Sequence, residues 1–306
     1  MNTENQNPQT APINRRTGFI AIVGRPNVGK STLLNALLGE KVSIVSKKPQ
    51  TTRNRITGIL TRGGDQFVFL DTPGMQNPRN KLGQFMLKTI GSAINDAGAC
   101  ILVVEPDGRV GRIEEGIIER FAARKLPALL VINKIDASDG EKVGETIKAY
   151  AERYNFKSII PISALKEKGV DIVLDEARSF LTIPGWFFEE DELTDQPERQ
   201  IAAEIIREKL LRTLDEEIPH GIAVVIEEFS DKKDLLSIRA EIFCERESHK
   251  RIIIGKKGEA LKKVGTYARE DLEEFFGTHV YLNLWVKVKE NWRDVQSNVS
   301  GFGYRE

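Results

Sequence analysis

The sequence contains few cysteines and no long apolar segment. Its two cysteines, Cys100 and Cys244, lie far apart in separate apolar runs, which argues against a disulfide framework and a cysteine metal site. No apolar run approaches the roughly 20 residues that cross a bilayer. Residues 1–16 are rich in Asn, Gln and Thr and lack the apolar core of a secretory signal. We therefore expect a soluble, cytoplasmic protein with a disordered N-terminal arm, and attachment to a membrane surface stays open.

The sequence also lacks a net charge, because 45 basic and 45 acidic residues cancel. A neutral total excludes a uniformly basic surface, but nucleic-acid binding depends on local patches and stays open. The 306 residues suffice for two domains that each bury a core, and a hydrophobic content of 40% is typical of globular proteins.

The most informative segment is Gly24–Ser31, which reads Gly-Arg-Pro-Asn-Val-Gly-Lys-Ser. It follows an apolar run of strand character, residues 19–23, and precedes an apolar pattern of helical spacing. Its glycines permit a tight turn in which backbone N–H groups converge on phosphate oxygens. Lys30 would supply charge to the β- and γ-phosphates, and Ser31 a hydroxyl to Mg²⁺. The nucleotide contacts predicted for this turn are Gly24, Asn27, Val28, Gly29, Lys30, Ser31 and Thr32.

Residues 42–59 contain a polar stretch without clear periodicity, Lys47–Arg53, which predicts a long loop. Thr52 or Thr51 would reach the Mg²⁺ when a γ-phosphate is present, and the loop would then act as a nucleotide-dependent switch. The alternative is that two threonines simply begin a strand.

A second apolar run, Phe67–Leu70, is typical of a strand buried on both faces and leads into Asp71-Thr-Pro-Gly74. A carboxylate at the end of such a strand, beside the phosphate loop, would hold Mg²⁺ through a water molecule. Gly74 would offer its backbone N–H to the γ-phosphate.

A third apolar run, Ala128–Ile132, precedes Asn133-Lys134-Ile135-Asp136. The Asp136 carboxylate would accept hydrogen bonds from the N1–H and amino group of guanine, a donor pair that adenine lacks on that edge. Asn133 would brace the loops, and the stem of Lys134 would lie along the base. The segment after a later strand completes the predicted base site, with the amide of Ala164 meeting the guanine O6; its residues are Ser163, Ala164 and Leu165.

Strands alternate with amphipathic helical patterns near residues 81–94, 112–124, 140–154 and 170–180, which predicts a mostly parallel α/β sheet covered on both faces. Residues 18–184 resemble the TrmE-Era-EngA branch of P-loop GTPases in the order of the motifs above. The resemblance implies hydrolysis of GTP to GDP with Mg²⁺. The catalytic residues that it implies are Asn27, Lys30, Thr52 and Gly74, with Ser31, Thr52 and Asp71 serving the metal.

Two positions bear on how water and charge are handled. Met75 stands where Ras-like enzymes carry the glutamine that orients the attacking water, so the water must be oriented otherwise. Asn27 resembles the asparagine that holds a K⁺ ion in several relatives, which implies K⁺ as a further cofactor. The alternative is that Asn27 only tolerates left-handed turn geometry.

Composition shifts after the first domain, because Glu189–Glu198 contains six acidic residues and no basic one. The following patterns predict helix, strand, strand, helix, helix and strand, with Arg251-Ile-Ile-Ile-Gly-Lys-Lys-Gly258 between the two middle helices. Glycines that flank lysines let a backbone approach a nucleic-acid strand closely. Residues 246–263 carry a net charge of +5, although a solvated helix–helix turn is the alternative. The predicted RNA contacts are Arg251, Ile254, Gly255, Lys256, Lys257 and Gly258.

This second unit resembles an α+β type II KH domain, and the two domains together resemble the Era family of GTPases. The resemblance implies a monomer that binds the 3′ end of small-subunit ribosomal RNA and assists maturation of the small ribosomal subunit, with peripheral membrane contact in some relatives. Alternatives are a constitutive RNA-binding protein or a GTPase that acts at the membrane. After the KH domain, Trp292 would stack on bases or pack internally. The predicted division is a disordered arm 1–16, a GTPase domain 17–184, an acidic linker 185–199, a KH domain 200–290 and a C-terminal helix and tail 291–306.

Overall fold

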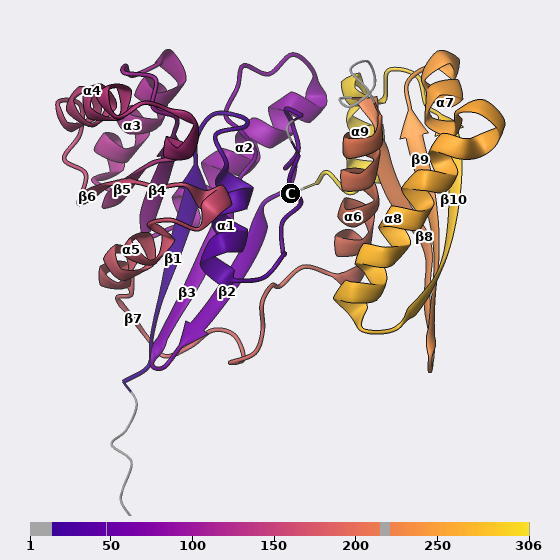
Figure 1. The fold of residues 1–306 in the computed structure, drawn as a ribbon, viewed down its shortest axis with the longest axis horizontal. Coiled ribbons are helices and arrows are strands. Elements are labelled where there is room, and N and C mark those ends of the chain that lie inside the picture. The colour runs from indigo at the N-terminus through magenta and orange to yellow at the C-terminus, as the bar shows by residue number, and fades with distance from the viewer. Residues whose placement is uncertain (1–13, 47, 215–220, 306) are drawn as a thin grey trace, which may run out of the picture.

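A computed structural model describes residues 14–46, 48–214 and 221–305 of the chain, and its parts are drawn in Figure 1. The first unit is a seven-stranded sheet with the order β2-β3-β1-β4-β5-β6, in which β7 also pairs with β1. The pairs β1–β3, β1–β4, β4–β5 and β5–β6 are parallel, whereas β2–β3 and β1–β7 are antiparallel. The strands are β1 (Arg16–Val23), β2 (Ile56–Arg62), β3 (Asp65–Asp71), β4 (Ala99–Val104), β5 (Ala128–Ile132), β6 (Ser158–Pro161) and β7 (Ile183–Pro184).

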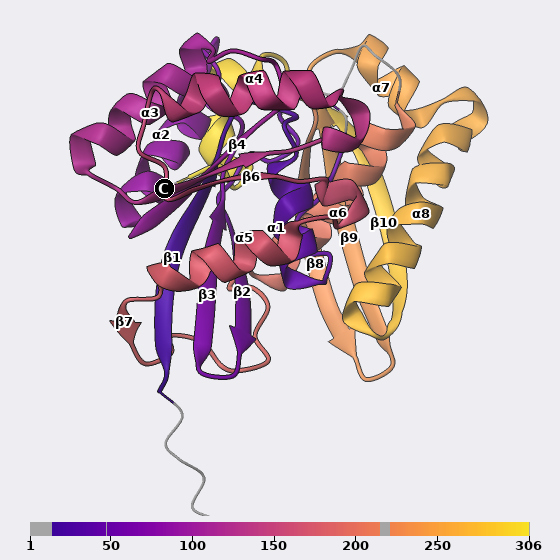
Figure 2. The same ribbon diagram turned by 60° about the vertical axis from the view of Figure 1, so that its left-hand side comes forward.

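Helices cover both faces of this sheet, as Figure 2 shows, and this confirms the predicted mostly parallel, doubly covered fold. Every residue of β4 and β5 is buried, which is why both strands read as unbroken apolar runs. One core lies under α1 and α5 and the other under α2, α3 and α4. The helices are α1 (Lys30–Leu38), α2 (Lys81–Asp96), α3 (Arg112–Arg124), α4 (Gly140–Ala151) and α5 (Val170–Ala177).

The parallel strands bring the functional segments to one edge of the sheet. In the β1–β3 pair, Ile22 lies opposite Asp71, so the phosphate loop and the acidic strand end are neighbours. The segment that begins at Asn133 leaves β5 at the same edge, two strands away from β1. The carboxyl edge of such a sheet is where ligands of open α/β folds bind.

The second unit is a three-stranded sheet with the order β10-β9-β8, covered by helices on one face. In β9 the buried positions alternate, at Leu236, Ile238, Ala240, Ile242 and Cys244, as expected for a sheet with one covered face. The element order matches the predicted type II KH domain. The elements are α6 (Glu198–Thr213), β8 (Ala223–Lys232), β9 (Leu235–Cys244), α7 (Glu247–Ile254), η5 (Lys256–Gly258), α8 (Glu259–Phe276) and β10 (His279–Val288).

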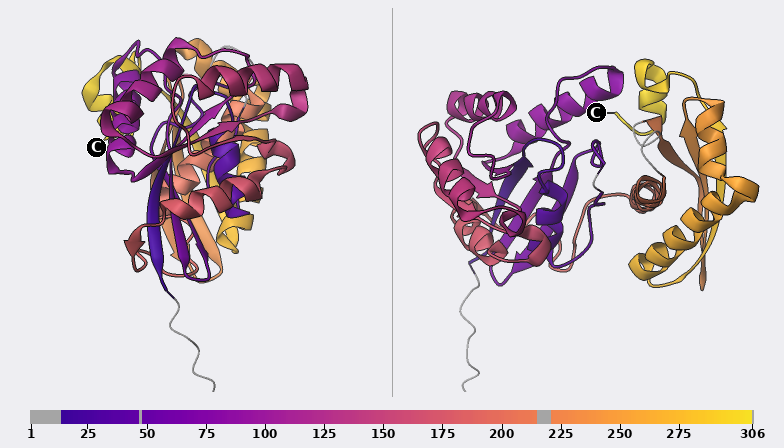
Figure 3. Two further views of the ribbon diagram at one scale, coloured as in Figure 1. Left: turned by 90° about the vertical axis from the view of Figure 1, so that its left-hand side faces the viewer. Right: turned by 45° about the horizontal axis from the view of Figure 1, so that its top comes forward.

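The chain ends in η6 (Trp292–Asp294) and α9 (Gln296–Gly301), which pack between the two units. Trp292 is fully buried with residues of α2 and the ring of Tyr304, so the structure contradicts stacking of this indole on bases and supports internal packing. The right panel of Figure 3 shows the C-terminal end running from the second unit toward α2. Phe85 of α2 contacts Tyr304 directly, with ring centroids 6.1 Å apart.

Two predicted boundary segments are more ordered than the sequence indicates. Residues 1–13 of the predicted arm lie outside the described residues, but Arg16 opens β1 and pairs with Asp65. The predicted acidic linker, residues 185–199, packs along the first sheet, because Ile59 donates its amide to the carbonyl of Leu193 at 2.9 Å. The described part of the chain contains no helix long and apolar enough to cross a membrane.

Candidate nucleotide site and RNA-binding face

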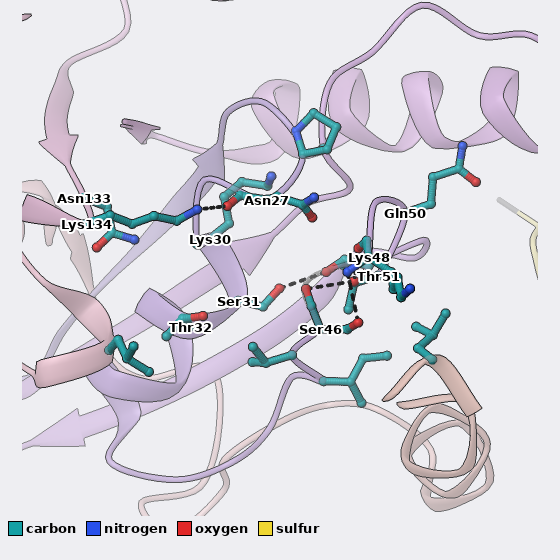
Figure 4. A pocket seen from close by; sticks show the side chains of 18 of the residues that line it. Asn27, Lys30, Ser31, Thr32, Ser46, Lys48, Gln50, Thr51, Asn133 and Lys134 are labelled. Atoms are coloured by element: carbon teal, nitrogen blue, oxygen red, sulfur yellow. Dashed lines mark hydrogen bonds between the residues drawn. The ribbon is translucent and has the colours of Figure 1, made fainter. Parts of the chain in front are cut away.

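A pocket of about 880 Å³ opens at the carboxyl edge of the first sheet (Figure 4). Asn27 and Lys134 meet on one side of it, and the loop that carries Ser46, Lys48 and Thr51 lies on the other. Helix α6 of the second unit closes the far wall with Leu211 and Arg212. Of the sequence-predicted residues, those that line the pocket are Asn27, Gly29, Lys30, Ser31, Thr32, Thr52, Gly74, Asn133, Lys134, Asp136 and Leu165.

The phosphate loop folds as its glycines predict. Gly24 has φ of 152° and Gly29 has φ of 97°, and a Cβ on Gly24 would lie 2.3 Å from the Val103 carbonyl oxygen. The Lys30 ammonium donates to the carbonyls of Gly24 at 3.2 Å and Arg25 at 2.8 Å. Burial lowers the pKa of Lys30 to about 8. Phosphate oxygens would favour the charged form of this ammonium, which is therefore placed to neutralise a bound triphosphate.

Four oxygen-bearing side chains converge beside the phosphate loop. The Ser31 hydroxyl lies 2.8 Å from the Thr52 hydroxyl and donates to Asp71 Oδ2 at 2.6 Å, and Ser43 donates to the same oxygen at 3.2 Å. Asp71 is fully buried, burial raises its pKa, and Oδ1 has no hydrogen-bond partner among the described residues. Hard oxygen ligands with one unsatisfied carboxylate oxygen fit Mg²⁺.

The structure distinguishes between Thr51 and Thr52. Both lie in the connection between α1 and β2, residues 39–55, which we call the switch loop after its predicted role. Thr52 is buried and faces Ser31, whereas the Thr51 hydroxyl donates to the Lys48 carbonyl at 2.6 Å. Thr52 is therefore the threonine that faces the oxygen cluster of Ser31 and Asp71. Gly74 packs against Pro26, where a Cβ on Gly74 would lie 2.5 Å from the Pro26 Cα atom.

Asn133 braces three segments, as predicted. Its Nδ2 donates to the Val28 carbonyl at 2.9 Å, and its Oδ1 accepts from the amide of Ala164 at 2.9 Å. A Cβ on Gly29 would lie 2.2 Å from Asn133 Nδ2, so the asparagine presses directly on the phosphate loop. The amide of Ala164 satisfies the buried Asn133 carbonyl in this structure, and its contact with the guanine O6 stays a prediction.

Asp136 presents its carboxylate to solvent at the mouth of the pocket. Ser163 is buried and donates to Asp136 Oδ1 at 2.6 Å, and this hydrogen bond lowers the pKa of Asp136. The carboxylate is thus ionised and held in one orientation, as recognition of two adjacent donors requires. Leu165 is 74% exposed beside it and can cover a base. Lys134 pairs with Glu105 and donates to the Asn27 carbonyl at 2.6 Å.

Asn27 and Met75 occupy the two positions that the sequence singles out for charge and water. Asn27 has φ of 65°, the left-handed geometry that the turn interpretation expects, and its role in holding K⁺ stays a prediction. The Met75 side chain packs against the core under α2, α3 and α4, and its amide donates to the Gly24 carbonyl at 3.0 Å. The methionine therefore fixes the backbone of this segment and offers no polar group to a water molecule.

The second glycine-rich turn is exposed on the surface of the KH unit. Gly255 has φ of 73°, and a Cβ there would lie 2.6 Å from the Ala260 Cβ, so the turn requires glycine. Lys256 and Lys257 are exposed, and Lys257 itself adopts φ of 51°. Arg251 is exposed on α7, and Ile254 is partly buried against the core. Gly258 precedes α8 with φ of 82° and nothing within 4 Å of its Cβ position.

Comparison with known proteins places these two units together. A model described as 50S ribosome-binding GTPase matches residues 19–134, and a KH-domain model matches residues 217–293. GTPase Era of Clostridium kluyveri is 49% identical over 291 residues, which cover 95% of this chain and 99% of the relative. GTPase Era of Clostridium botulinum strain Kyoto is 50% identical over 292 residues, with the same two shares covered. The chain belongs to the Era family of GTPases.

Solved Era structures share the fold along nearly the whole chain. A crystal structure of Era in complex with MgGDPNP and nucleotides 1506–1542 of 16S ribosomal RNA is 39% identical, with a TM-score of 0.90. A variant of Aquifex aeolicus Era bound to GDP·AlF4⁻ is 40% identical, with a TM-score of 0.91. Each match covers 95% of this chain and 100% of the other. The predicted Era-family architecture, a P-loop GTPase followed by a KH domain, is confirmed.

Sequence reasoning about this Era-family GTPase missed the residues that join the two units. Arg53 is fully buried and donates to the Ile222 carbonyl at 2.6 Å and to the Tyr304 hydroxyl at 3.0 Å. The fully buried Glu208 of α6 accepts the Val45 amide at 2.9 Å. Ser43, which reaches Asp71, was missed as well. Ser43 and Arg53 lie in unpatterned loop sequence and Glu208 is an acidic residue within a helix, so only the three-dimensional packing identifies them.

We predict that Asp136→Asn shifts base preference away from guanine. The asparagine amide would place a donor against the N1–H or amino group of guanine, whereas xanthine offers an acceptor at that edge. The affinity for GTP should fall and the affinity for XTP should rise, each by about tenfold or more. These changes correspond to the cost of an unpaired polar group. Asp171→Asn, in the exposed first turn of α5, is the matched control. Retained selectivity for GTP would contradict the assignment.

Proposed function

We propose that this Era-family GTPase is a GTP-hydrolysing switch that binds the 3′ region of small-subunit ribosomal RNA and assists maturation of the small ribosomal subunit. The solved Era complex with MgGDPNP and 16S nucleotides supports this proposal, because its similarity extends over both units. The 50S-related description belongs to a family model that matches the first unit alone, and it is therefore less specific for the RNA partner.

The observation that carries the proposal is the opposite placement of two consecutive residues. Thr52 faces Ser31 at the metal position, and Arg53 points into the second unit. The Arg53 guanidinium lies over the rings of Trp292 and Tyr304, with its Cζ 5.8 Å and 5.6 Å from their centroids. Burial lowers the pKa of Arg53. A movement of Thr52 toward or away from a γ-phosphate would therefore displace a buried cation in the KH-side packing.

A second set of contacts joins the same loop to helix α6. Arg207 is fully buried and donates to the carbonyl of Thr51, and also to that of Gln50 at 3.4 Å. Burial alone would lower the pKa of Arg207, but the Glu204 carboxylate raises it, so the guanidinium stays charged. Lys41 donates to Glu208 Oε2 at 2.8 Å. The switch loop is thus held by the second unit at both of its ends.

Such contacts control RNA binding only if the two nucleotide states position the switch loop differently, because a nucleotide that binds both conformations equally shifts nothing. A constitutive RNA-binding protein is the competing function, and it predicts equal RNA affinity with GDP and GTP. The two functions differ in one measurable quantity, the dependence of RNA affinity on the bound nucleotide.

We predict that the RNA affinity of the full chain differs between GDP and a nonhydrolysable GTP analogue, and that Arg53→Ala removes most of the difference. The test is fluorescence anisotropy with a 3′-terminal small-subunit RNA and each nucleotide in excess. Arg55→Ala is the matched control, since Arg55 lies in the same loop and pairs with Asp96 on the surface. Identical RNA affinities with all nucleotides in the unmodified chain would refute the switch.

We further propose that Mg²⁺ is the divalent ion, held by Ser31 and Thr52 and, through water, by Asp71. When bound, this ion would neutralise charge that develops on the phosphate oxygens. Lys30 would hold the same phosphates from the opposite side, and Gly74 would donate its amide to the γ-phosphate. With Met75 turned into the core, the attacking water would be oriented by backbone groups of the switch segments.

We propose K⁺ as a second ion, held by Asn27 and the switch backbone. Turnover should then be faster in K⁺ than in Na⁺ at matched ionic strength, and Asn27→Ala should remove most of the difference. Steady-state GTP hydrolysis in the two salts measures this effect. Equal rates in K⁺ and Na⁺ would leave Asn27 with the turn-forming role alone.

The Gly255–Gly258 turn is proposed to bind the RNA backbone, and we predict that Gly258→Asp weakens RNA binding by about tenfold or more. The carboxylate would face phosphate, next to Lys256 and Lys257. Gly277→Asp is the matched control, because Gly277 also has positive φ and open space at its Cβ position, at the other end of α8. GTP hydrolysis without RNA should be unchanged in both variants.

Equal loss of RNA binding in both glycine variants would show that strain at α8, and not the turn itself, weakens binding.

We propose a cytoplasmic monomer that contacts the membrane peripherally through the same basic face. Binding to anionic vesicles without RNA binding at moderate salt would instead favour a GTPase of the membrane surface.

A further inference from the structure

A charged side chain is buried beneath the phosphate loop, outside the residues assigned to the nucleotide. Glu114, in the first turn of α3, is 0% exposed. Its ion pair in the described residues is with Arg25 of the phosphate loop, through Nε and Oε1. Arg25 also pairs with Asp107 through Nη2. The guanidinium is therefore held at two points by carboxylates from the segment that follows β4.

A buried carboxylate is costly, and α3 does not need it for packing. Ile117, Ile118 and Phe121 supply the buried apolar face of the helix. An isolated buried charge would cost several kcal/mol, and the ion pair with Arg25 offsets this, although neither carboxylate oxygen of Glu114 has a hydrogen-bond partner among the described residues. The Glu114 carboxylate also packs closely against Gly111. A Cβ at Gly111 would lie 2.5 Å from Glu114 Oε2. The carboxylate thus occupies a fitted space next to the loop.

The backbone of Arg25 is part of the phosphate-binding geometry. Its carbonyl accepts the Lys30 ammonium at 2.8 Å. The next residue, Pro26, contacts Gly74, whose amide is proposed to meet the γ-phosphate. A shift at Arg25 would therefore move the Lys30 ammonium and the space available to Gly74 together.

We propose that Arg25, clamped by Glu114 and Asp107, is a positioning residue for GTP hydrolysis. The two carboxylates fix the position of Arg25 in the phosphate loop. Lys30 and Gly74 are thereby held in the arrangement that the transition state requires. This inference rests on the GTP-hydrolysing part of the proposed function and is independent of RNA binding. A misplacement on the order of 1 Å can lower a rate by about a hundredfold, so a small relaxation of the loop is sufficient for a measurable effect.

The competing explanation is that this ion pair, in which Glu114 is buried and Arg25 is partly exposed, only stabilises the fold. The two explanations differ in what they change in the folded protein. A purely stabilising pair affects the melting temperature and leaves kcat of the folded fraction unchanged. A positioning pair lowers kcat for GTP more than it weakens GDP binding, because GDP keeps the β-phosphate contact of Lys30 but has no γ-phosphate for Gly74 to meet.

The test is Glu114→Gln in the full chain, which removes the charge and keeps the shape. We expect kcat for GTP to fall by about tenfold or more, whereas GDP affinity changes by less than about threefold. Asp65→Asn is the matched control, since Asp65 is a mostly buried carboxylate that pairs with Arg16 away from the pocket. This control should keep kcat while lowering the melting temperature.

A second variant, Arg25→Met with Glu114→Leu, replaces the pair by apolar groups. It should recover thermal stability, because apolar replacement of a buried ion pair is often neutral or stabilising, but it should not recover kcat. A Glu114→Gln protein that melts earlier yet turns over at the unmodified rate would overturn the inference, as would recovery of kcat in the double variant. Absence of GTP hydrolysis in the unmodified chain would refute the proposed function itself, which separates the two failures.

Discussion

The contact between the Ser31 and Thr52 hydroxyls connects the phosphate loop to the switch loop, and the packing of the two domains depends on it. Ser31 belongs to the first turn of α1 and cannot move without the phosphate loop, whereas Thr52 lies on the long connection between α1 and β2. Their 2.8 Å separation closes the oxygen cluster around Asp71. Because Arg53 follows directly and is buried in the second unit, the position of one hydroxyl constrains the packing of two domains.

Among the described residues, the buried charged side chains lie where loops and domains meet and not in the apolar cores. Lys30 contacts the phosphate loop, Arg53 extends from the switch loop into the second unit, Arg207 of α6 contacts the switch loop, and Glu114 pairs with Arg25 of the phosphate loop. Apolar packing would be the less costly way to stabilise each joint. Charged groups specify one arrangement, because any other leaves a desolvated charge without its partner. This specificity is a reason to keep several costly buried ions.

The local motifs could be predicted from sequence because each fixes its own geometry. Glycines bound the two turns, and Asp136 follows a buried strand, so these residues identify themselves by spacing. The junction could not be predicted, because Arg53, Glu208 and Trp292 become significant only when the units pack. The sequence leaves Trp292 either to stack on bases or to pack internally, and its burial against α2, a distant segment, decides for packing. The hydrogen bond from the Ala164 amide to Asn133 could not be predicted either, because it joins loops that follow two different strands.

The two phosphate-binding turns follow the same backbone principle in different surroundings. Gly29 and Gly258 are both left-handed glycines that precede helices, so each turn directs N–H groups outward from a helix start. In the first turn, Lys30 is only 6% exposed. In the second turn, Lys256 and Lys257 are exposed, and the acidic Glu259 begins α8. A buried site is little screened by salt, whereas an exposed one loses attraction as counterions compete. With the proposed function, the nucleotide site is therefore the one of fixed geometry and little salt dependence, whereas RNA binding at the second turn depends on salt.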